Sequence, residues 1–556
     1  MIKPLSLLVA LGLSIPAFGA DLGQARLLVD QQRFVEAIAA YDVLLTEQAD
    51  NTDLLIEAAR VQAWADRHPS SARLYRKAIE TAPQRRRDVL LPLAWQLAWG
   101  GAHDEAIPLF LEVAQDMPAQ RTEALHGLTE SYSASSRLNE ALAAYRLLSA
   151  AEAGDLKAEK GEARVLLWLD RHDEAATAYR LILKTYPQDK EAQIGLARAL
   201  NYSSRHFAAV SAYAAAANDN AALARDIRVE RATALRWSGL EDESLAVLGD
   251  TAGRDADLLR GQLKRETGAS LRGDFETSWD SDELDVHALS AGWQQRFTSG
   301  RSLDVSARSA RLEQHDRRID GRQLLVRAGS RVGSVAQGLL WPALTVGVRE
   351  YDGWQTPAWK LQLKSIPTDF WRIDVEAGNE VIENIRSVDN KVTLNGLSAS
   401  TDWRFAPRWG ATVGGAVTRF DDGNRRSRLI GRVEHIVATT QPRVVVGLEA
   451  MGFSDTDPRI DRGYYNPERY REFKMLARAE HEVADWLLET RLALGKLWET
   501  PGSSSGLYAW EVSAARDVAR LFRLRVYAGG SDSSTFQSSG SGYTRNYLGA
   551  SLIWFY

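Results

Sequence analysis

The segment Tyr547-Leu548-Gly549-Ala550-Ser551-Leu552-Ile553-Trp554-Phe555-Tyr556 ends the chain and decides the fold. In a β-strand, side chains point alternately to the two faces, so every second residue shares a face. Counting back in steps of two, one face is apolar throughout: Tyr556, Trp554, Leu552, Ala550 and Leu548. An apolar stripe that ends in aromatic residues is typical of a strand facing lipid, because aromatic side chains favour the membrane interface.

The same alternation recurs from about Thr267 to the C-terminus. About sixteen such segments fit into roughly 290 residues, the strand-and-loop length of an outer-membrane barrel. Clear examples lie at residues 271–279, 371–377, 488–494 and 522–528. The second half of the chain therefore predicts an antiparallel transmembrane β-barrel of about 16 strands.

The connections between these segments alternate in length. Short ones are expected at 406–408, 483–485 and 518–520, and long ones at 383–391, 454–469 and 532–541. Periplasmic turns of such barrels are short and extracellular loops are long, so both ends of the barrel sequence are expected on the periplasmic side. The alternative, a soluble β-sandwich or propeller, would need a second layer over the apolar faces, and the rest of the chain offers none.

The first half has a different period. A small residue recurs every 34 or 35 positions, at Ala37, Ser71, Ala106, Ala141, Ala175, Ala209 and Ser244. Prolines at 83, 118 and 187 follow the second helix of their units. This is the tetratricopeptide period, in which two antiparallel helices form each unit. About seven units would stack into a superhelix, and the fold class is α plus β in separate domains.

Two columns of the repeat invite functional interpretations. Aromatic residues recur on the first helix at Trp64, Trp99, Trp168, Tyr202 and Trp237. They could form a ladder for stacking sugars, but their helical spacing favours packing in the core of the repeats. The histidines His68, His103, His172 and His206 occupy the same or adjacent columns near the turns. Repetition explains these histidines, so no metal site is predicted there.

Composition and the N-terminal residues limit the classes of protein to which this chain can belong. The net charge of −5 argues against nucleic-acid binding, and the absence of cysteine excludes disulfides and thiol chemistry. Residues 1–20 resemble a secretory signal peptide, with Lys3, a short apolar run and small residues at 17–20. We expect a periplasmic repeat domain over 21–262 and an outer-membrane barrel over 263–556.

The inward face of the predicted barrel is rich in charged residues of both signs. We expect a polar route for a hydrophilic chain, with more than half of the charged pairs bracing the wall. Its predicted lining is Asp274, Glu276, Arg372, Asp374, Glu376, Glu472, Glu489, Arg491 and Arg523. In the long loop, Tyr464, Tyr465 and Tyr470 could fold inward and stack on sugars, or they could belong to an aromatic girdle.

Signs of catalysis are weak. Gly502-Ser503-Ser504-Ser505-Gly506 matches a nucleophile-elbow pattern, but no helix is expected after it. Two short acidic loop clusters, at 280–283 and 455–457, are better explained as solvated loops than as calcium sites. We predict no enzyme activity, no cofactor and no metal site.

This combination of signal peptide, repeats and barrel resembles the outer-membrane exporters of bacterial exopolysaccharides. These are the poly-β-1,6-N-acetylglucosamine export porins and the cellulose-synthase operon C proteins. The resemblance rests on the architecture, on units such as Leu166–Ala175, and on Gly463-Tyr464-Tyr465-Asn466-Pro467, which is similar to a barrel motif of the cellulose type. The chain is shorter and has fewer repeats than those exporters.

The resemblance implies a function and partners. The barrel would pass an exopolysaccharide chain outward, and the repeats would bind the polymer, a periplasmic modifying enzyme or an inner-membrane synthase complex. Outer-membrane lipid and the barrel assembly machinery would be further partners, and nucleic acid would not. The alternatives are a plugged barrel that anchors the repeats as a docking platform, and a surface receptor or adhesin.

Overall fold

The computed structural model describes residues 21–218, 220–297, 300–458, 461–500, 502, 504–518, 521–532 and 543–556. The expected signal peptide, part of the turn at 518–520, Ser503 and most of the loop at 532–541 lie outside these residues. The chain divides into two compact units, Met1–Ala199 and Leu200–Tyr556.

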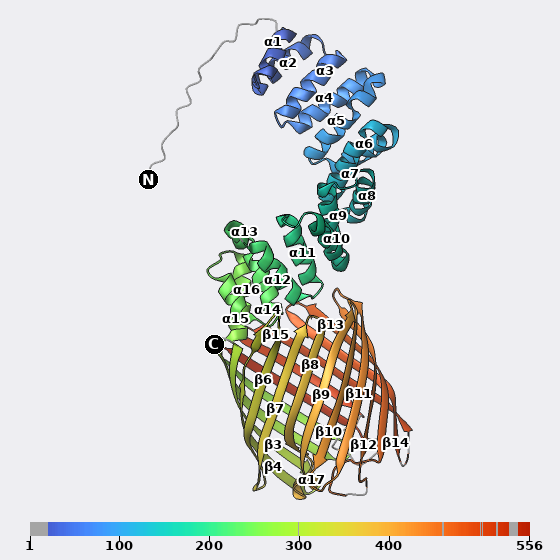
Figure 1. Ribbon diagram of the computed structural model, residues 1–556. Coiled ribbons are helices and arrows are strands. Elements are labelled where there is room, and N and C mark those ends of the chain that lie inside the picture. Colours follow the sequence, from blue (N-terminus) through green and yellow to red (C-terminus); the bar gives the residue numbers. More distant parts are fainter. Residues whose placement is uncertain are drawn as a thin grey trace, which may run out of the picture. The chain divides into compact units, whose positions relative to one another are not determined.

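The first unit consists of antiparallel helix pairs (Figure 1). Two short 3-10 helices, η1 (Pro83–Arg85) and η2 (Pro118–Gln120), follow two of the pairs. The helices are α1 (Leu22–Asp30), α2 (Phe34–Glu47), α3 (Thr52–Trp64), α4 (His68–Thr81), α5 (Arg86–Trp99), α6 (His103–Asp116), α7 (Arg121–Ala134), α8 (Leu138–Ala151), α9 (Leu156–Trp168), α10 (His172–Thr185) and α11 (Lys190–Tyr202).

The repeat positions found in the sequence form the core of the helix pairs. The small residues at 37, 71, 106, 141, 175, 209 and 244 are all fully buried. At position 71, the Ser71 hydroxyl donates to the carbonyl oxygen of Ala59, at 2.7 Å. The small side chain thus lets two helices approach closely.

A second small residue accommodates the aromatic ring of the preceding unit. A Cβ atom on Gly127, Gly161 or Gly195 would lie 2.2 Å from the ring of Phe110, Tyr145 or Tyr179, respectively. The three rings are buried. Glycine is therefore required where each ring packs against the first helix of the next unit.

The second unit begins with five helices and continues into the barrel. Its helices are α12 (His206–Ala217), α13 (Ala221–Asp226), α14 (Arg228–Trp237), α15 (Glu241–Leu248) and α16 (Arg254–Thr267). The expected domain boundary between 262 and 263 falls inside α16. Among the described residues, none of the helices combines the length and the apolar composition that crossing a bilayer requires.

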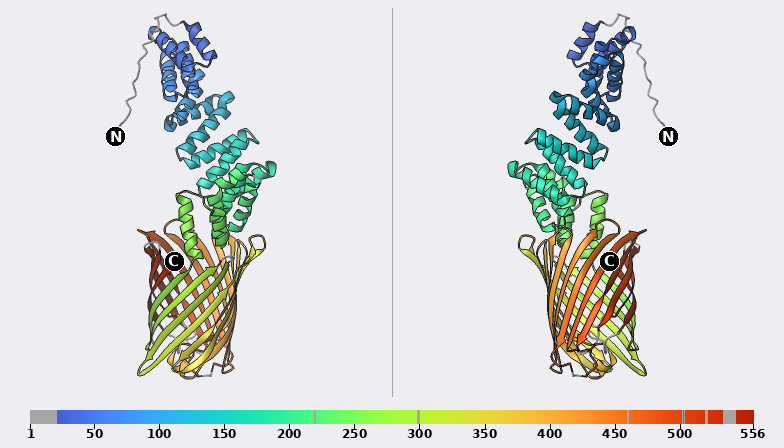
Figure 2. Two further views of the ribbon diagram at one scale, coloured as in Figure 1. Left: turned by 90° about the vertical axis from the view of Figure 1, so that its left-hand side faces the viewer. Right: turned by 90° about the vertical axis from the view of Figure 1, so that its right-hand side faces the viewer.

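The strands are antiparallel and close into a ring (Figure 2). The described sheet has 17 strands. One of them, β5, has only three residues and pairs with β6 next to the segment of β6 that pairs with β4. The other sixteen close through β1, which pairs with both β2 and β17. The strands are β1 (Ser270–Asp280), β2 (Leu284–Phe297), β3 (Arg301–Gln314), β4 (Arg317–Gly329), β5 (Val332–Ser334), β6 (Gly338–Tyr351), β7 (Trp354–Thr368), β8 (Trp371–Val381), β9 (Thr393–Ala406), β10 (Trp409–Phe420), β11 (Arg425–Ala438), β12 (Arg443–Asp455), β13 (Arg469–Val483), β14 (Trp486–Thr500), β15 (Ser504–Val518), β16 (Phe522–Ser531) and β17 (Arg545–Phe555).

The outward face of the ring is apolar, as the alternation predicts. On β17, Leu548, Leu552 and Trp554 are 40–49% exposed, whereas Ser551 on the other face is buried. Rings gather at one rim, where Trp371 stacks on Trp403 at 5.4 Å between ring centroids. A closed, even-numbered barrel with an apolar band and an aromatic rim is a transmembrane barrel of the outer-membrane type.

Candidate functional site: the barrel lumen and its two ends

The lumen wall is lined by charged side chains that are paired with one another. All nine predicted lining residues lie on the lumen face of their strands, and each has a group of opposite charge within 4.0 Å. The pairs are Arg272–Asp274 (2.7 Å), Glu276–Arg545 (3.6 Å), Arg372–Asp374 (2.6 Å), Lys360–Glu376 (2.8 Å), Glu472–Lys474 (2.6 Å), Glu489–Arg491 (3.7 Å) and Asp517–Arg523 (2.7 Å).

The structure brings few of the nine into contact with each other. Arg372 pairs with Asp374 on β8, and Glu489 pairs with Arg491 on β14. The others take partners that were not predicted, such as Lys474, which lies between Glu472 and Glu449. Because each charge has a counter-charge, the wall is polar without a strong field of one sign.

Two loops pack against the inner wall at the end of the barrel that carries α17 (Ile385–Asp389), which Figure 1 locates. The first, between β8 and β9, contains α17. The second connects β12 to β13. They touch one another, since the side-chain amide of Asn384 donates to the carbonyl oxygen of Gly463 at 2.8 Å, and Arg386 pairs with Asp461 at 2.5 Å.

The three tyrosines, Tyr464 and Tyr465 in the second loop and Tyr470 at the start of β13, are buried inside the protein. Tyr464 stacks on Phe420 at 4.2 Å between centroids and donates to Asp422 at 2.9 Å. Tyr470 stacks on Phe453 at 4.7 Å. Tyr464, Tyr465 and Tyr470 are 5%, 7% and 0% exposed. In this state protein groups occupy the ring faces of Tyr464 and Tyr470, and a role of these tyrosines in stacking on sugars stays a prediction.

A buried ion pair fixes the second loop to the wall. Arg426 and Asp455 lie 3.0 Å apart with side chains only 2% and 0% exposed. The Arg426 guanidinium lies 4.3 Å over the Phe453 ring and also donates to the carbonyl oxygen of Tyr465. No sequence pattern distinguishes this network, because a buried pair and a solvated lumen pair follow the same alternation.

A cluster of charged and polar side chains likewise fixes the first loop to the barrel wall. Arg308 donates to both carboxylate oxygens of Glu383, and the Tyr351 hydroxyl donates to Glu383 at 2.8 Å. Ile385 and Val388 of α17 are buried in an apolar cluster with Leu312, among others. Both loops are therefore anchored to the inner wall.

At the opposite end, the starts of α12 and α15 contact the turns of the barrel. The Asp369 carboxylate, in the turn between β7 and β8, accepts hydrogen bonds from the backbone N–H groups of Phe207 (2.7 Å) and Ala208 (3.1 Å) at the start of α12. Burial raises the pKa of the Asp369 carboxyl, although these two donors act to lower it. Asp369 thus caps a helix from another part of the chain.

A second contact lies at the start of α15. The Arg331 side chain, 6% exposed, donates to the carbonyl oxygen of Gly239 at 2.7 Å and pairs with Glu243 at 2.6 Å. The backbone N–H of Gly300 donates to Asp242 at 2.9 Å. Next to these contacts is a cavity of about 440 Å³, lined by Trp341, Lys364, Arg327, Asp374 and Glu376, among others. Sequence reasoning missed Arg331 and Asp369, because polar residues in short turns carry no distinguishing signal.

The aromatic column of the repeats does not lie in the core. Trp64, Trp99, Trp168, Tyr202 and Trp237 are 45–59% exposed, so the expectation of core packing is wrong. Each is the last residue of its helix, and about half of its surface remains in solvent. Trp64 packs on Phe34 at 6.2 Å, and Trp99 packs on His68 at 5.7 Å.

Three of the four repeated histidines, His68, His172 and His206, have local partners. His68 Nδ1 lies 3.0 Å from the Gln96 side chain, and His206 Nδ1 lies 2.9 Å from the Asn201 side chain. Burial, together with the positive charge of Arg404, lowers the pKa of His206 to about 4. Within the described ranges, these four histidines are not part of a group that could hold a metal ion.

The comparisons with known proteins bear on the barrel. Residues 339–494 match the family model of the PgaA membrane β-barrel domain. The matched span extends from β6 to β14 and includes both inward loops. The search of curated proteins gives no match.

Solved structures resemble each half at low identity. A bacterial polysaccharide outer-membrane secretin is 14% identical, covers 52% of this chain and 99% of its own, and has a TM-score of 0.44. A tetratricopeptide repeat protein from Parabacteroides merdae is 14% identical, covers 44% of this chain and 96% of its own, and has a TM-score of 0.33. CdiB from Acinetobacter baumannii is 7% identical, covers 52% of this chain and 60% of its own, and has a TM-score of 0.34.

Proposed function

We propose that the protein is an outer-membrane porin that exports an exopolysaccharide, and that its repeats bind the polymer or the enzymes that make and modify it. The match of residues 339–494 to the PgaA membrane β-barrel domain carries this proposal. The paired charges of the lumen support it. A balanced polar wall offers hydrogen bonds to hydroxyl and amide groups without holding an ion of one sign.

Polymer would enter beside the cavity at the helix-bearing end. There, Asp374 and Glu376 face the lumen next to Trp341 and Lys364. Carboxylates accept hydrogen bonds from sugar hydroxyl groups, and an indole ring presents an apolar face. We place this end in the periplasm, because both ends of the barrel sequence lie at it and the two inward loops lie at the other end.

The test is polymer secretion by a double variant, Asp374→Asn with Glu376→Gln. Each charged hydrogen bond that is lost costs about 1.5–3 kcal/mol, and about 1.4 kcal/mol corresponds to a factor of ten, so secretion should fall by at least about tenfold. The control is Asp320→Asn. Asp320 is also paired with arginine, Arg318 at 3.0 Å, but its side chain lies on the outward face of β4. Secreted polymer is measured at equal amounts of folded barrel, and equal secretion by both variants would refute the lumen route.

The inward loops favour a second candidate, a barrel sealed by its own loops that anchors the repeats as a docking platform. The observation behind it is the contact of Asn384 and Arg386 with the loop between β12 and β13. Single-channel recording in planar bilayers separates the two candidates. A conducting or openable barrel supports export, and a barrel that stays sealed while its repeats bind envelope proteins supports the platform.

A further inference from the structure

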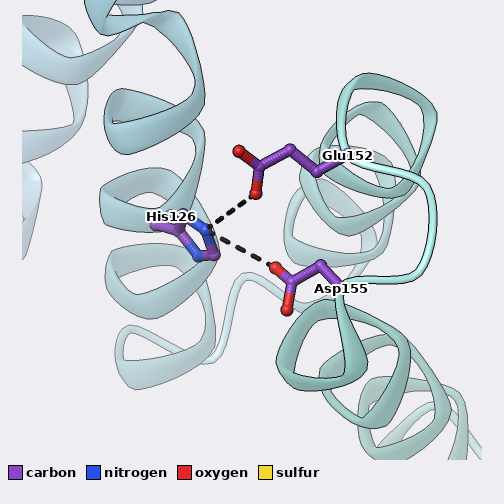
Figure 3. A group of neighbouring side chains, drawn as sticks. All are labelled: His126, Glu152 and Asp155. Atoms are coloured by element: carbon purple, nitrogen blue, oxygen red, sulfur yellow. Dashed lines mark ion pairs between the residues drawn. The ribbon is translucent and has the colours of Figure 1, made fainter.

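Three side chains of the first unit converge at the junction of two consecutive helix pairs (Figure 3). His126 lies on α7, Glu152 follows the end of α8, and Asp155 precedes α9. The His126 Nε2 atom lies 3.5 Å from Asp155 Oδ2 and 3.9 Å from Glu152 Oε2. One ligand atom from each residue fits within 4.8 Å of the other two.

One oxygen of this group has no hydrogen-bond partner. Asp155 Oδ1 accepts from the backbone N–H of Lys157 at 2.9 Å, which is the normal role of a helix N-cap. Asp155 Oδ2 points toward His126, is buried, and has no hydrogen bond among the described residues. The Lys157 ammonium pairs instead with Glu130 at 2.9 Å. A buried carboxylate oxygen without a hydrogen bond is costly, and the His126 imidazole at 3.5 Å is its neighbour in an ion pair, so its position favours a cation.

In the next repeat, a positively charged side chain stands at the position equivalent to His126. Lys160 lies 34 residues after His126, and Asp189 lies 34 residues after Asp155. The Lys160 ammonium is 3.1 Å from Asp189 and 2.7 Å from Glu191. In that unit the carboxylate at the start of the helix faces a permanent cation. In the unit of His126 it faces an imidazole, which can bind a metal ion through its neutral ring nitrogen.

We propose that His126, Glu152 and Asp155 bind a divalent metal ion of the zinc type. Zinc takes one imidazole nitrogen and carboxylate oxygens at about 2.0–2.1 Å, which places tetrahedral ligand atoms about 3.3 Å apart. The observed separations of 3.5 and 3.9 Å need only a small adjustment to match. Water would complete the coordination. The ion would join consecutive helix pairs, because His126 belongs to one pair and Asp155 to the next.

The test uses the full-length protein in detergent, stripped of metal and titrated with zinc. Calorimetry counts bound zinc, and amide exchange followed by mass spectrometry reports on α7 to α9. Zinc should slow exchange in these helices. In His126→Gln and in Glu152→Gln this effect should require at least about tenfold more zinc, because each loses one ligand. Glu152 is 48% exposed on its side chain, so its replacement should not disturb the fold.

The control is His315→Gln, an exposed histidine 3.4 Å from Glu283 on the barrel, which should leave the zinc response of α7 to α9 unchanged. Equal zinc effects on these helices in the wild type and in His126→Gln would overturn the proposal. Absence of any zinc effect would also overturn it, and the group would then be an ordinary histidine–carboxylate ion pair.

Discussion

At the scale of the residue, the glycines of the repeat show how one atom decides packing. Gly161 lies in the middle of α9 and faces the buried Tyr145 ring of the preceding unit. Alanine normally stabilises a helix by about 1 kcal/mol relative to glycine. Here the added carbon would lie 2.2 Å from Tyr145 Cε1, which forces the ring to move.

We predict that Gly161→Ala destabilises the α8–α9 contact by about 1–3 kcal/mol, the usual cost of overpacking. Amide exchange in α8 and α9 should accelerate. Gly261→Ala in α16 is the matched control, because nothing lies within 4 Å of the new carbon. Exchange in α16 should stay the same or slow. Unchanged exchange in Gly161→Ala would show that Tyr145 can move without cost.

At the scale of the element, the loop between β12 and β13 is held by its backbone as well as by its tyrosines. Gly463 has a φ of +94°, and a Cβ atom there would lie 2.7 Å from both Arg386 Cβ and the backbone nitrogen of Ser387. A side chain at this position must therefore push the loop away from α17.

We predict that Gly463→Ala separates the two loops and raises the single-channel conductance of the barrel. Gly423→Ala is the control, since Gly423 has a similar φ of +91° in the turn between β10 and β11, but no atom lies within 4 Å of the new carbon. Both variants place alanine at a similar positive φ, but only Gly463→Ala clashes with α17. Equal conductance in the two variants would mean that contact of the loops does not limit the pore.

At the scale of the whole molecule, the last helices belong structurally to the barrel. The compact unit that holds the barrel begins at Leu200, and Asp369 and Arg331 contact α12 and the start of α15 within it. A chain that begins at residue 190 keeps these contacts, whereas one that begins at residue 263 loses them.

We predict that the barrel of the shorter chain is less stable by at least about 1.5–3 kcal/mol, the value of one charged hydrogen bond. The measurement is the midpoint of urea unfolding in detergent, followed by the loss of heat-modifiable migration on gels. Asp369→Ala in the full chain should shift the midpoint in the same direction. Identical midpoints for the two truncated chains would show that the helices contribute nothing to the barrel.

Sequence periodicity was sufficient to predict both architectures, whereas the role of the nine lumen residues from Asp274 to Arg523 stays a prediction. A period of 34 or 35 and a period of 2 are local properties, and an apolar face has to be covered by helix or by lipid. The same local reasoning failed for Trp64 and its equivalents. Helical spacing gives the face on which a residue lies, but whether a neighbouring element covers that face depends on the stacking of the units.

The alternation along each strand therefore determined the barrel and its polar interior, whereas the tertiary structure alone decided how its ends are closed. The contacts Arg426–Asp455, Asn384–Gly463 and Asp369–Phe207 join residues between 29 and 162 positions apart. Their side chains look like any polar loop or lumen residue until folding brings the partners together. Burial and pairing are properties of the assembled barrel, so the sequence could not show that Tyr464 would be covered by protein or that Asp369 would cap a helix.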